Sequence, residues 1–361
     1  MVIRHRGLDR HRERSEAIHD RRLPRLLRSL AMTGSNLAMT GSKLAMASFV
    51  AMTALVIASP ALASPQQLIE RAQSAAETLS FQGSFVHQQE SVLHTSKITQ
   101  GRRGNDMITR VQALEGFRQE VVRGPSETRT YWPDKQMVKI DQTGLKRSAF
   151  PRLFIGNPQQ ILANYEIKQA GTIRIANLDA TEYAITPKHA GRWPMRIWVD
   201  RNSGMILKCQ KLATDDRVVE QAAFTELSFS AKPIQVALAP SYTDIKNWKT
   251  HDASMTRIDS APELKFSQET LKGFDRVGVF DRNTSDSKQA SVRRYVFSDG
   301  IATVSVFVQS KAVSGPLTDK VRHRGALSML SREIGDTWIT VMGDIPPDAL
   351  ARFAQTIEWK N

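Results

Sequence analysis

The sequence of 361 residues predicts an α+β protein with two domains. A helical repeat of apolar residues begins directly after residue 63, and segments with alternating apolar residues follow it as far as residue 229. A proline-containing segment then precedes a second, shorter series of alternating segments, which ends in another helical repeat. A chain of this length is also typical of two domains of ordinary size.

The N-terminal region has the features of an export signal. The apolar stretch at 48–63, SFVAMTALVIASPALA, has the length of a signal-peptide core and ends in the small-x-small pattern Ala61-Leu62-Ala63. We therefore expect residues 1–63 to be a signal peptide that is cleaved after Ala63, and the mature protein to reside in the periplasm. The alternative is an uncleaved membrane anchor, for which the apolar stretch is short.

A tandem duplication precedes the signal-peptide core. LAMTGSN at 30–36 is followed by LAMTGSK at 37–43, which places Met32 and Met39 in register. A chain that started at Met39 would have a signal peptide of normal proportions. We hypothesise that translation starts at Met32 or Met39, so that residues 1–38 are not translated. Peptides from residues 4–28 in a mass spectrum of the precursor would contradict this.

The mature chain is expected to begin with an amphipathic helix. Ser64 is a suitable N-cap, Pro65 suits the first helical turn, and Gln67 completes a capping box. The apolar residues that follow at helical spacing are Leu68, Ala72, Ala75, Ala76 and Leu79.

From Phe81 onward the period changes to two, which predicts strands. We interpret residues 64–230 as a first domain in which one or two helices cover a long antiparallel meander. A turn at Pro133-Asp134-Lys135 predicts a hairpin, and 157–166 begins as a short helix at Asn157-Pro158. The expected strands lie around 81–85, 128–132, 137–140, 173–176, 182–186, 193–199, 205–212 and 218–229.

Residues 231–250 contain two prolines and show no sustained period, so we predict that they link two domains. Residues 251–361 then form a small second α+β domain. Asp299-Gly300 marks a turn between two expected strands, and another strand is expected at 338–341. A terminal amphipathic helix is predicted by Leu350, Phe353, Ala354 and Ile357.

Charge and cysteine content exclude several functions. The net charge of +14 divides into +6 for residues 1–63, +7 for 64–250 and +1 for 251–361. Because this charge is spread along an exported chain, we expect no nucleic acid partner. The single cysteine, Cys209, excludes an intramolecular disulfide framework and every metal site that needs several cysteines.

Signatures of catalysis are missing from the sequence. It contains no G-x-S-x-G elbow, no H-E-x-x-H, no Walker loop and no G-x-G-x-x-G, and no histidine pair has metal-ligand spacing. We therefore expect no enzyme activity, no metal and no cofactor. An exported hydrolase stays open as an alternative, since the members of a catalytic triad need not be close in sequence.

The first domain is rich in aromatic residues, most of which we expect in its core. A curved sheet that a helix covers on one face leaves room for an apolar cleft, which is the usual form of a ligand site. Arginines beside aromatic residues suit a ligand with acyl tails and an anionic head group; the alternative is a filled core beneath the arginine side chains. The predicted lipid-binding residues are Phe85, Trp132, Met137, Phe154, Tyr165, Trp198, Arg192 and Arg196.

Several stretches of the mature chain occur in an order that is typical of one family. They are Leu79–His87, Gly116–Arg123, Asn164–Ile167, Arg196–Asp200, Ser203–Leu207, Phe297–Ala302, Ser305–Val308 and Thr340–Pro346. Together they resemble the RseB/MucB family, periplasmic regulators of the extracytoplasmic stress sigma factor. The resemblance implies a first domain like the lipoprotein carriers LolA and LolB, which is a curved antiparallel half-barrel with plugging helices, and a smaller α+β C-terminal domain.

The resemblance also implies a role in envelope stress. The protein would bind the periplasmic domain of a membrane-anchored anti-sigma factor, RseA-like or MucA-like, and shield it from site-1 proteolysis until a lipid or lipopolysaccharide signal releases it. The alternative function is a periplasmic lipoprotein or lipid carrier chaperone. The second domain argues against that alternative, because a carrier of this fold needs only the first domain. The sequence leaves both a monomer and a homo-oligomer open.

Overall fold

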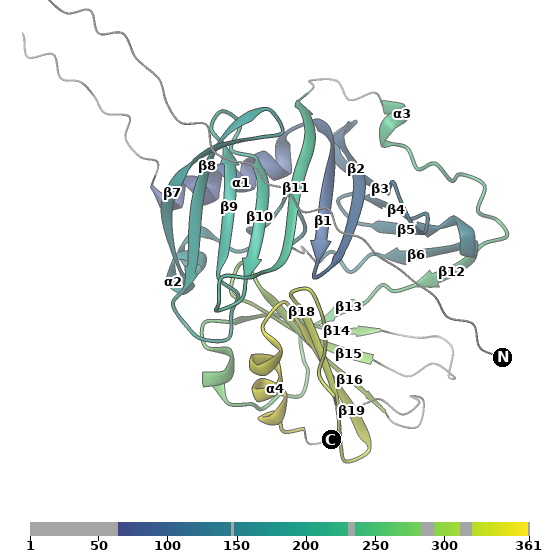
Figure 1. Ribbon diagram of the computed structural model, residues 1–361. Helices are drawn as coiled ribbons and strands as arrows, with labels where there is room; N and C mark the ends of the chain where they lie inside the picture. Colours follow the sequence, from purple (N-terminus) through teal and green to yellow (C-terminus); the bar gives the residue numbers. More distant parts are fainter. Residues whose placement is uncertain (1–63, 146–147, 230–234, 283–291, 311–319, 360–361) are drawn as a thin grey trace, which may run out of the picture. The chain divides into compact units, whose positions relative to one another are not determined.

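A computed structural model describes residues 64–145, 148–229, 235–282, 292–310 and 320–359, and these residues form two β-sheets with short helices (Figure 1). The predicted signal peptide and the duplication within it lie outside the described residues. No helix in the described ranges combines the length and the apolar character needed to cross a bilayer.

The first sheet has twelve strands. Its strands are β1 (Phe81–Gln89), β2 (Val92–Arg103), β3 (Asp106–Ala113), β4 (Glu120–Arg123), β5 (Thr128–Trp132), β6 (Met137–Asp141), β7 (Tyr165–Ile175), β8 (Leu178–Pro187), β9 (Met195–Asp200), β10 (Ile206–Leu212), β11 (Val218–Phe229) and β12 (Lys249–Asp252). Their order is β12-β6-β5-β4-β3-β2-β1-β11-β10-β9-β8-β7. Neighbours pair antiparallel, except that β12 runs parallel to β6. The sheet is therefore open, with β12 and β7 at its edges.

Helix α1 (Pro65–Thr78) begins as the sequence predicts. The Ser64 hydroxyl accepts a hydrogen bond from the Gln67 N–H at 3.2 Å, and the Gln67 side chain accepts one from the Ser64 N–H at 3.0 Å. This reciprocal capping box satisfies two N–H groups that the first turn leaves free. The buried face of the helix consists of Leu68, Ile69, Ala72, Ala75 and Ala76.

The core of the first sheet forms between α1, α2 (Pro158–Asn164) and the sheet face that they cover. Leu68 and Ile69 of α1 pack in one cluster with Ile161 of α2 and with Ile185 and Ile197 of the sheet. Because two helices fill one face of an open, curved sheet, the predicted half-barrel with plugging helices is confirmed (Figure 1).

The segment predicted as a linker, 231–250, follows the first sheet closely where the structure describes it. Helix α3 (Gln235–Leu238) and β12 belong to this stretch. The rings of Tyr242 and Trp248 lie with their centroids 6.0 Å and 6.4 Å from that of the buried Tyr131. Aromatic packing and the pairing of β12 with β6 therefore hold the described part of this segment against the first sheet.

The second sheet has seven strands in the order β13-β14-β15-β16-β19-β18-β17. Helix α4 (Pro347–Gln355) buries Leu350 and Phe353 against it, and the predicted turn at Asp299-Gly300 joins β15 to β16. The second unit is therefore α+β, as expected. The strands are β13 (Thr256–Ile258), β14 (Asp275–Arg282), β15 (Val292–Ser298), β16 (Thr303–Ser310), β17 (Arg322–Arg324), β18 (Leu327–Ile334) and β19 (Thr337–Gly343).

Candidate functional site

Four of the eight predicted lipid-binding residues are buried in the core of the first sheet. Phe85 and Trp198 belong to one apolar cluster, and Phe154 and Tyr165 belong to another. Each of the four side chains is at most 9% exposed. Each of the two apolar clusters therefore contains two of the predicted residues, and all four lie in the core rather than on an open surface.

The other four predicted residues lie in different surroundings. Trp132 and Met137 face each other across the β5–β6 hairpin and are half-buried. The Arg192 side chain is buried, whereas the Arg196 side chain is 44% exposed and lies 3.8 Å from the carboxylate of Asp216. We expected the two arginines to face one anionic head group. In the structure one side chain is buried and the other is exposed to solvent.

The helix-covered face of the first sheet is filled around Phe150. The Phe150 ring centroid lies 5.4 Å from that of Phe85 and 4.8 Å from that of Phe224. Phe85 and Phe224 are themselves 6.3 Å apart, so the three rings form one cluster. An acyl chain that entered here would have to displace Phe150, which is half-buried and belongs to a segment between β6 and α2.

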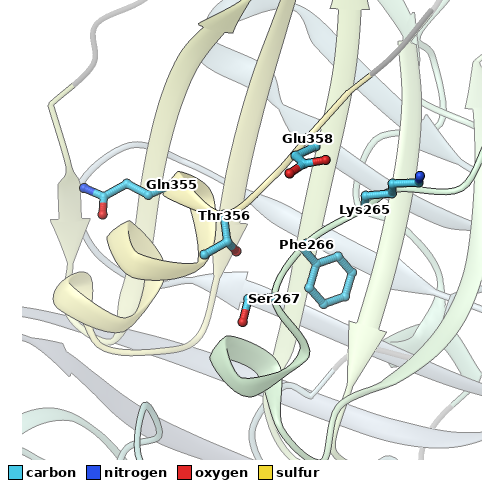
Figure 2. A pocket seen from close by; sticks show the side chains of 6 residues that line it. All are labelled: Lys265, Phe266, Ser267, Gln355, Thr356 and Glu358. Atoms are coloured by element: carbon cyan, nitrogen blue, oxygen red, sulfur yellow. The ribbon is translucent and has the colours of Figure 1, made fainter.

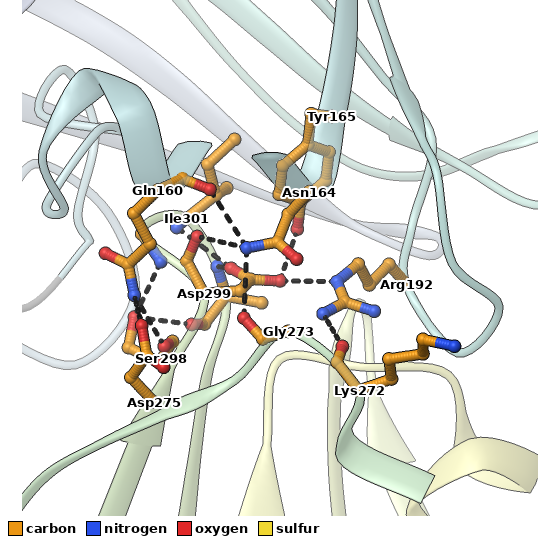
Figure 3. A network of polar contacts seen from close by, with 12 residues as sticks. Gln160, Asn164, Tyr165, Arg192, Lys272, Gly273, Asp275, Ser298, Asp299 and Ile301 are labelled. Carbon is orange, nitrogen blue, oxygen red and sulfur yellow. Dashed lines mark hydrogen bonds and ion pairs between the residues drawn. The ribbon is translucent and has the colours of Figure 1, made fainter. Parts of the chain in front are cut away.

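A polar network joins the two sheets around Asp299 (Figure 3). The Arg192 Nε donates to Asp299 Oδ2 at 2.6 Å, and the Tyr165 hydroxyl donates to the same oxygen at 2.8 Å. The other carboxylate oxygen accepts the N–H groups of Ile301 and Ala302 at 3.0 Å and 2.8 Å. Burial raises the pKa of Tyr165 well above its ordinary value, and the Asp299 charge adds to this, so the hydroxyl stays a donor.

Helix α2 contributes a second group of contacts to the same network (Figure 3). The Asn164 Nδ2 donates to the Gly273 carbonyl at 2.9 Å, and the Gln160 Nε2 donates to Asp275 Oδ2 at 2.8 Å. A Cβ at position 273 would lie 1.8 Å from the Asn164 Oδ1, at a φ of +77°. Only glycine therefore permits this close approach of the two chain segments.

A second contact between the sheets is built on Lys211 of β10. Its Nζ forms an ion pair with Asp344, which follows β19. Burial alone would lower the pKa of Lys211, but the charges of Asp344 and Glu220 outweigh it and raise the pKa. The lysine therefore remains charged at this contact.

Glu220 of β11 extends this contact. Its Oε2 accepts the Ala326 N–H at 2.9 Å, and its Oε1 lies 2.9 Å from the His87 Nε2. Burial opposes ionisation of this carboxyl, but the hydrogen bond with His87, the charge of Lys211 and the Ala326 N–H lower its pKa to about 2. The Ala326 carbonyl in turn accepts from the Trp193 indole at 3.1 Å. Glu220 is therefore ionised and connects the first sheet to the second through its hydrogen bond with the Ala326 N–H.

A pocket of about 430 Å³ lies beside the end of α4 and the segment before η2 (Gln268–Leu271) (Figure 2). None of the eight predicted residues lines it. Its lining combines side chains of opposite charge, so it differs from the apolar cleft that we predicted for an acyl chain. The lining residues are Lys265, Phe266, Ser267, Gln355, Thr356 and Glu358.

Of the residues that join the two sheets, Arg192 and Tyr165 were predicted from the sequence in another role, and the charged partners across the contact were not predicted. Asp299 was assigned only to a turn, and neither Asp344 nor Lys211 was singled out. One signal was present: Asp299 and Asp344 both lie in stretches that carry the family resemblance, 297–302 and 340–346. A carboxylate within such an apolar stretch has to find a partner when it is buried, but the partner comes from a distant part of the chain.

Two family models and several known proteins match most of this chain. The MucB/RseB N-terminal domain family matches residues 64–243, and the MucB/RseB C-terminal domain family matches residues 261–358. The sigma-E factor regulatory protein RseB of Haemophilus influenzae is 21% identical over 82% of this chain and 92% of its own length. The sigma factor AlgU regulatory protein MucB of Pseudomonas aeruginosa is 25% identical over 82% of this chain and 91% of its own.

Solved structures of related proteins have a similar fold. The crystal structure of MucB in complex with MucA(peri) is 22% identical, covers 81% of this chain and 98% of its own, and has a TM-score of 0.59. The two family matches follow each other in the order of the two sheets and together span most of the chain. The chain therefore belongs to the MucB/RseB family.

Proposed function

We propose that this protein binds the periplasmic domain of a membrane-anchored anti-sigma factor and so restrains an envelope-stress sigma factor. The observation that supports this most is the match of both family domains along one chain. The relatives in Haemophilus influenzae and Pseudomonas aeruginosa are named as regulatory proteins of sigma factors. A similar structure is MucB in complex with MucA(peri), which supports an anti-sigma factor as the partner.

The proposed role is that of a binding protein in the periplasm rather than an enzyme. Residues 1–63 would direct export, and residues 64–230 would form the lipid-sensing domain. The segment 231–250 would connect it to residues 251–361, which contribute partner binding. By occupying the periplasmic domain of the anti-sigma factor, the protein would shield it from site-1 proteolysis.

We further propose that a lipid or lipopolysaccharide releases the anti-sigma factor. A ligand shifts such an equilibrium only if it binds the partner-free state more tightly. The eight predicted lipid-binding residues remain the candidates for this site. Because the ring of Phe150 packs on Phe85 and Phe224, entry of an acyl chain would require that ring to move. For the lipid to release the partner, this movement has to be easier in the partner-free state than in the partner-bound state.

The test uses the mature chain and the purified periplasmic domain of the anti-sigma factor from the same organism. Calorimetry is expected to show a complex, and site-1 cleavage of the anti-sigma factor is expected to slow in that complex. Addition of lipopolysaccharide should restore cleavage. A chain that binds but does not slow cleavage would contradict shielding. Capture of outer-membrane lipoproteins, without the anti-sigma factor, would support a carrier instead.

A further inference from the structure

We propose that residues 235–252 are a releasable strap, whose last part leaves β6 when an acyl chain occupies the predicted lipid site. The strap consists of α3, the segment with Tyr242 and Trp248, and β12, which lies beside β6 at the edge of the first sheet (Figure 1). Its release frees the chain that leads into the second sheet. This inference rests on the proposed lipid signal and adds the path by which that signal reaches the second sheet.

Trp132 and Met137, two of the predicted lipid-binding residues, lie on the same face of the first sheet as α1. They pair across the β5–β6 hairpin, so their side chains share a face, and Thr130 shares it because it lies two residues before Trp132. A row of paired residues connects Thr130 to Ile98, which belongs to one apolar cluster with Ala75 of α1. This row is Ile98, Val111, Val121 and Thr130. An acyl chain on this face therefore contacts the hairpin from the side of α1.

The strap lies against the opposite face of the same hairpin. Tyr131 and Val138 alternate with the two lipid-site residues along β5 and β6, and they are 1% and 0% exposed. Tyr242 and Trp248 of the strap pack on Tyr131, and their own ring centroids are 5.4 Å apart. Adjacent residues of a strand point to opposite faces, so the β5–β6 hairpin separates the strap from the lipid site by the thickness of one sheet.

The beginning of the strap is anchored to β3 and β4 rather than to the hairpin. The Arg110 Nη1 donates to the Ala237 carbonyl at 3.1 Å, and the Ser241 N–H donates to the Glu120 Oε1 at 2.9 Å. Arg110 and Glu120 also form an ion pair at 3.0 Å, with side chains that are 11% and 3% exposed. Buried, hydrogen-bonded charges of this kind are costly to separate, so this end of the strap stays in place.

The other end of the strap continues directly into the second sheet. Only residues 253–255 separate β12 from β13, and Met255 packs with Phe280 and Val296 of the second sheet. A connection of this length spans at most about 10 Å. The position of β12 therefore limits where the edge of the second sheet can lie.

The pairing of β12 with β6 is the part of the strap that yields. It is parallel, and all side chains of β12 are exposed; parallel pairing is slightly less stable per residue than antiparallel pairing. When an acyl chain displaces the hairpin, β12 cannot follow, because both ends of the strap are held. The bonds that break include those from the Lys249 N–H to the Gln136 carbonyl at 2.8 Å and from the Ala253 N–H to the Ile140 carbonyl at 2.7 Å.

The experiment measures hydrogen exchange of single amides in the mature chain, with lipopolysaccharide as the probe. Lipopolysaccharide is expected to speed exchange at Lys249 and Ala253 by about tenfold or more, because release of β12 exposes both N–H groups. The Ser241 N–H is the internal control, since Glu120 holds it at the anchored end of the strap and its exchange should not change.

A variant tests the strap without lipid. Trp248→Ala removes the ring that packs on Tyr131 and Tyr242, and it should speed exchange at Lys249 and Ala253 by up to about tenfold. In this variant less lipopolysaccharide should also suffice to release the anti-sigma factor. The matched control for exchange is Trp359→Ala, which truncates another half-buried tryptophan, packed on Tyr295 of the second sheet. It should leave the Lys249 amide unchanged.

The outcomes separate the strap from the proposed function. If lipopolysaccharide binds and releases the anti-sigma factor while exchange at Lys249 and Ala253 stays the same, the strap is wrong and the proposed function stands. If lipopolysaccharide neither binds nor releases the partner, the lipid signal is wrong and the strap with it. Equal acceleration at Ser241 would also overturn the strap, because it would indicate loosening of the whole domain rather than release of β12.

Discussion

At the residue scale, Glu220 is the carboxylate whose surroundings couple stability to pH. It contacts the Ala326 N–H of the second sheet and His87 of the first, with Lys211 nearby. Partners that favour the charged form keep the pKa of Glu220 at about 2, well below its ordinary 4.5. A carboxyl with a depressed pKa stabilises the folded state above its unfolded pKa, and this stabilisation is lost as pH falls toward the folded value.

The expected outcome is a loss of stability between about pH 4.5 and about pH 2 that depends on Glu220. The contribution is on the order of 3 kcal/mol in the free energy of unfolding. Denaturant titrations at about pH 5 and about pH 3 should show a smaller change in Glu220→Gln than in the unchanged protein. Glu226→Gln, on an exposed position of the same strand, serves as control. Identical pH slopes in Glu220→Gln and the unchanged protein would contradict the assignment.

At the scale of elements, two strands carry tryptophans with different roles. Trp198 of β9 is 6% exposed and belongs to one apolar cluster with Ala75 of α1 and Phe81 of β1. Trp132 ends β5 beside its hairpin turn and is half-buried. A side chain that neighbours enclose on all sides leaves a cavity when it is truncated, whereas a half-buried one leaves space that solvent fills.

Trp198→Ala is therefore expected to lower the free energy of unfolding by about 3–5 kcal/mol, and Trp132→Ala by clearly less. Urea titrations monitored by circular dichroism compare the two variants. Trp132→Ala should stay folded. Lipid-triggered release of the anti-sigma factor can therefore be measured in this variant, and weaker release would show that Trp132 contributes to lipid binding. If both substitutions lowered the free energy of unfolding by the same amount, the expected difference between the buried Trp198 and the half-buried Trp132 would be contradicted.

At the scale of the whole molecule, buried ion pairs join the two sheets. Arg192 lies in the connection between β8 and β9, and Asp299 lies in the turn between β15 and β16. Both side chains are almost fully buried, at 2% and 0% exposure. Removal of one member of such a pair leaves an uncompensated charge, which is more costly than the pair itself is stabilising.

Arg192→Ala is expected to reduce the free energy of unfolding by about 3–5 kcal/mol. The double variant Arg192→Met/Asp299→Asn should recover part of this loss, because no charge remains buried and the asparagine oxygen can still accept the N–H groups of Ile301 and Ala302. Arg352→Ala is the control, since its pair with Asp348 on α4 is exposed and should contribute less than about 1 kcal/mol. If Arg192→Ala cost no more than Arg352→Ala, the pair would not hold the two sheets together.

Features that depend on neighbours in sequence could be predicted. The capping box of α1, the hairpin around residues 133–135 and the turn at Asp299-Gly300 all form as expected, because each depends on a few successive residues. Other strands were not predicted. In the first sheet these are β2, β3 and β4, and β7 was expected only near its end, where Ile173 lies; in the second sheet they are β13, β14, β17 and β18. Their pairing partners supply stability that local patterns do not show.

The sequence by itself determined the α+β class, the order of helices and strands in outline, and the resemblance to the MucB/RseB family. Only the tertiary structure decided that Arg192 and Tyr165 bind Asp299, at sequence separations of 107 and 134, and that residues near Trp248 pack on the first sheet. It also separated Arg192 from Arg196, which the sequence had placed at one head group. The physical reason is that a buried charge takes its partner from whichever segment the fold brings near, and spacing along the chain does not identify that segment.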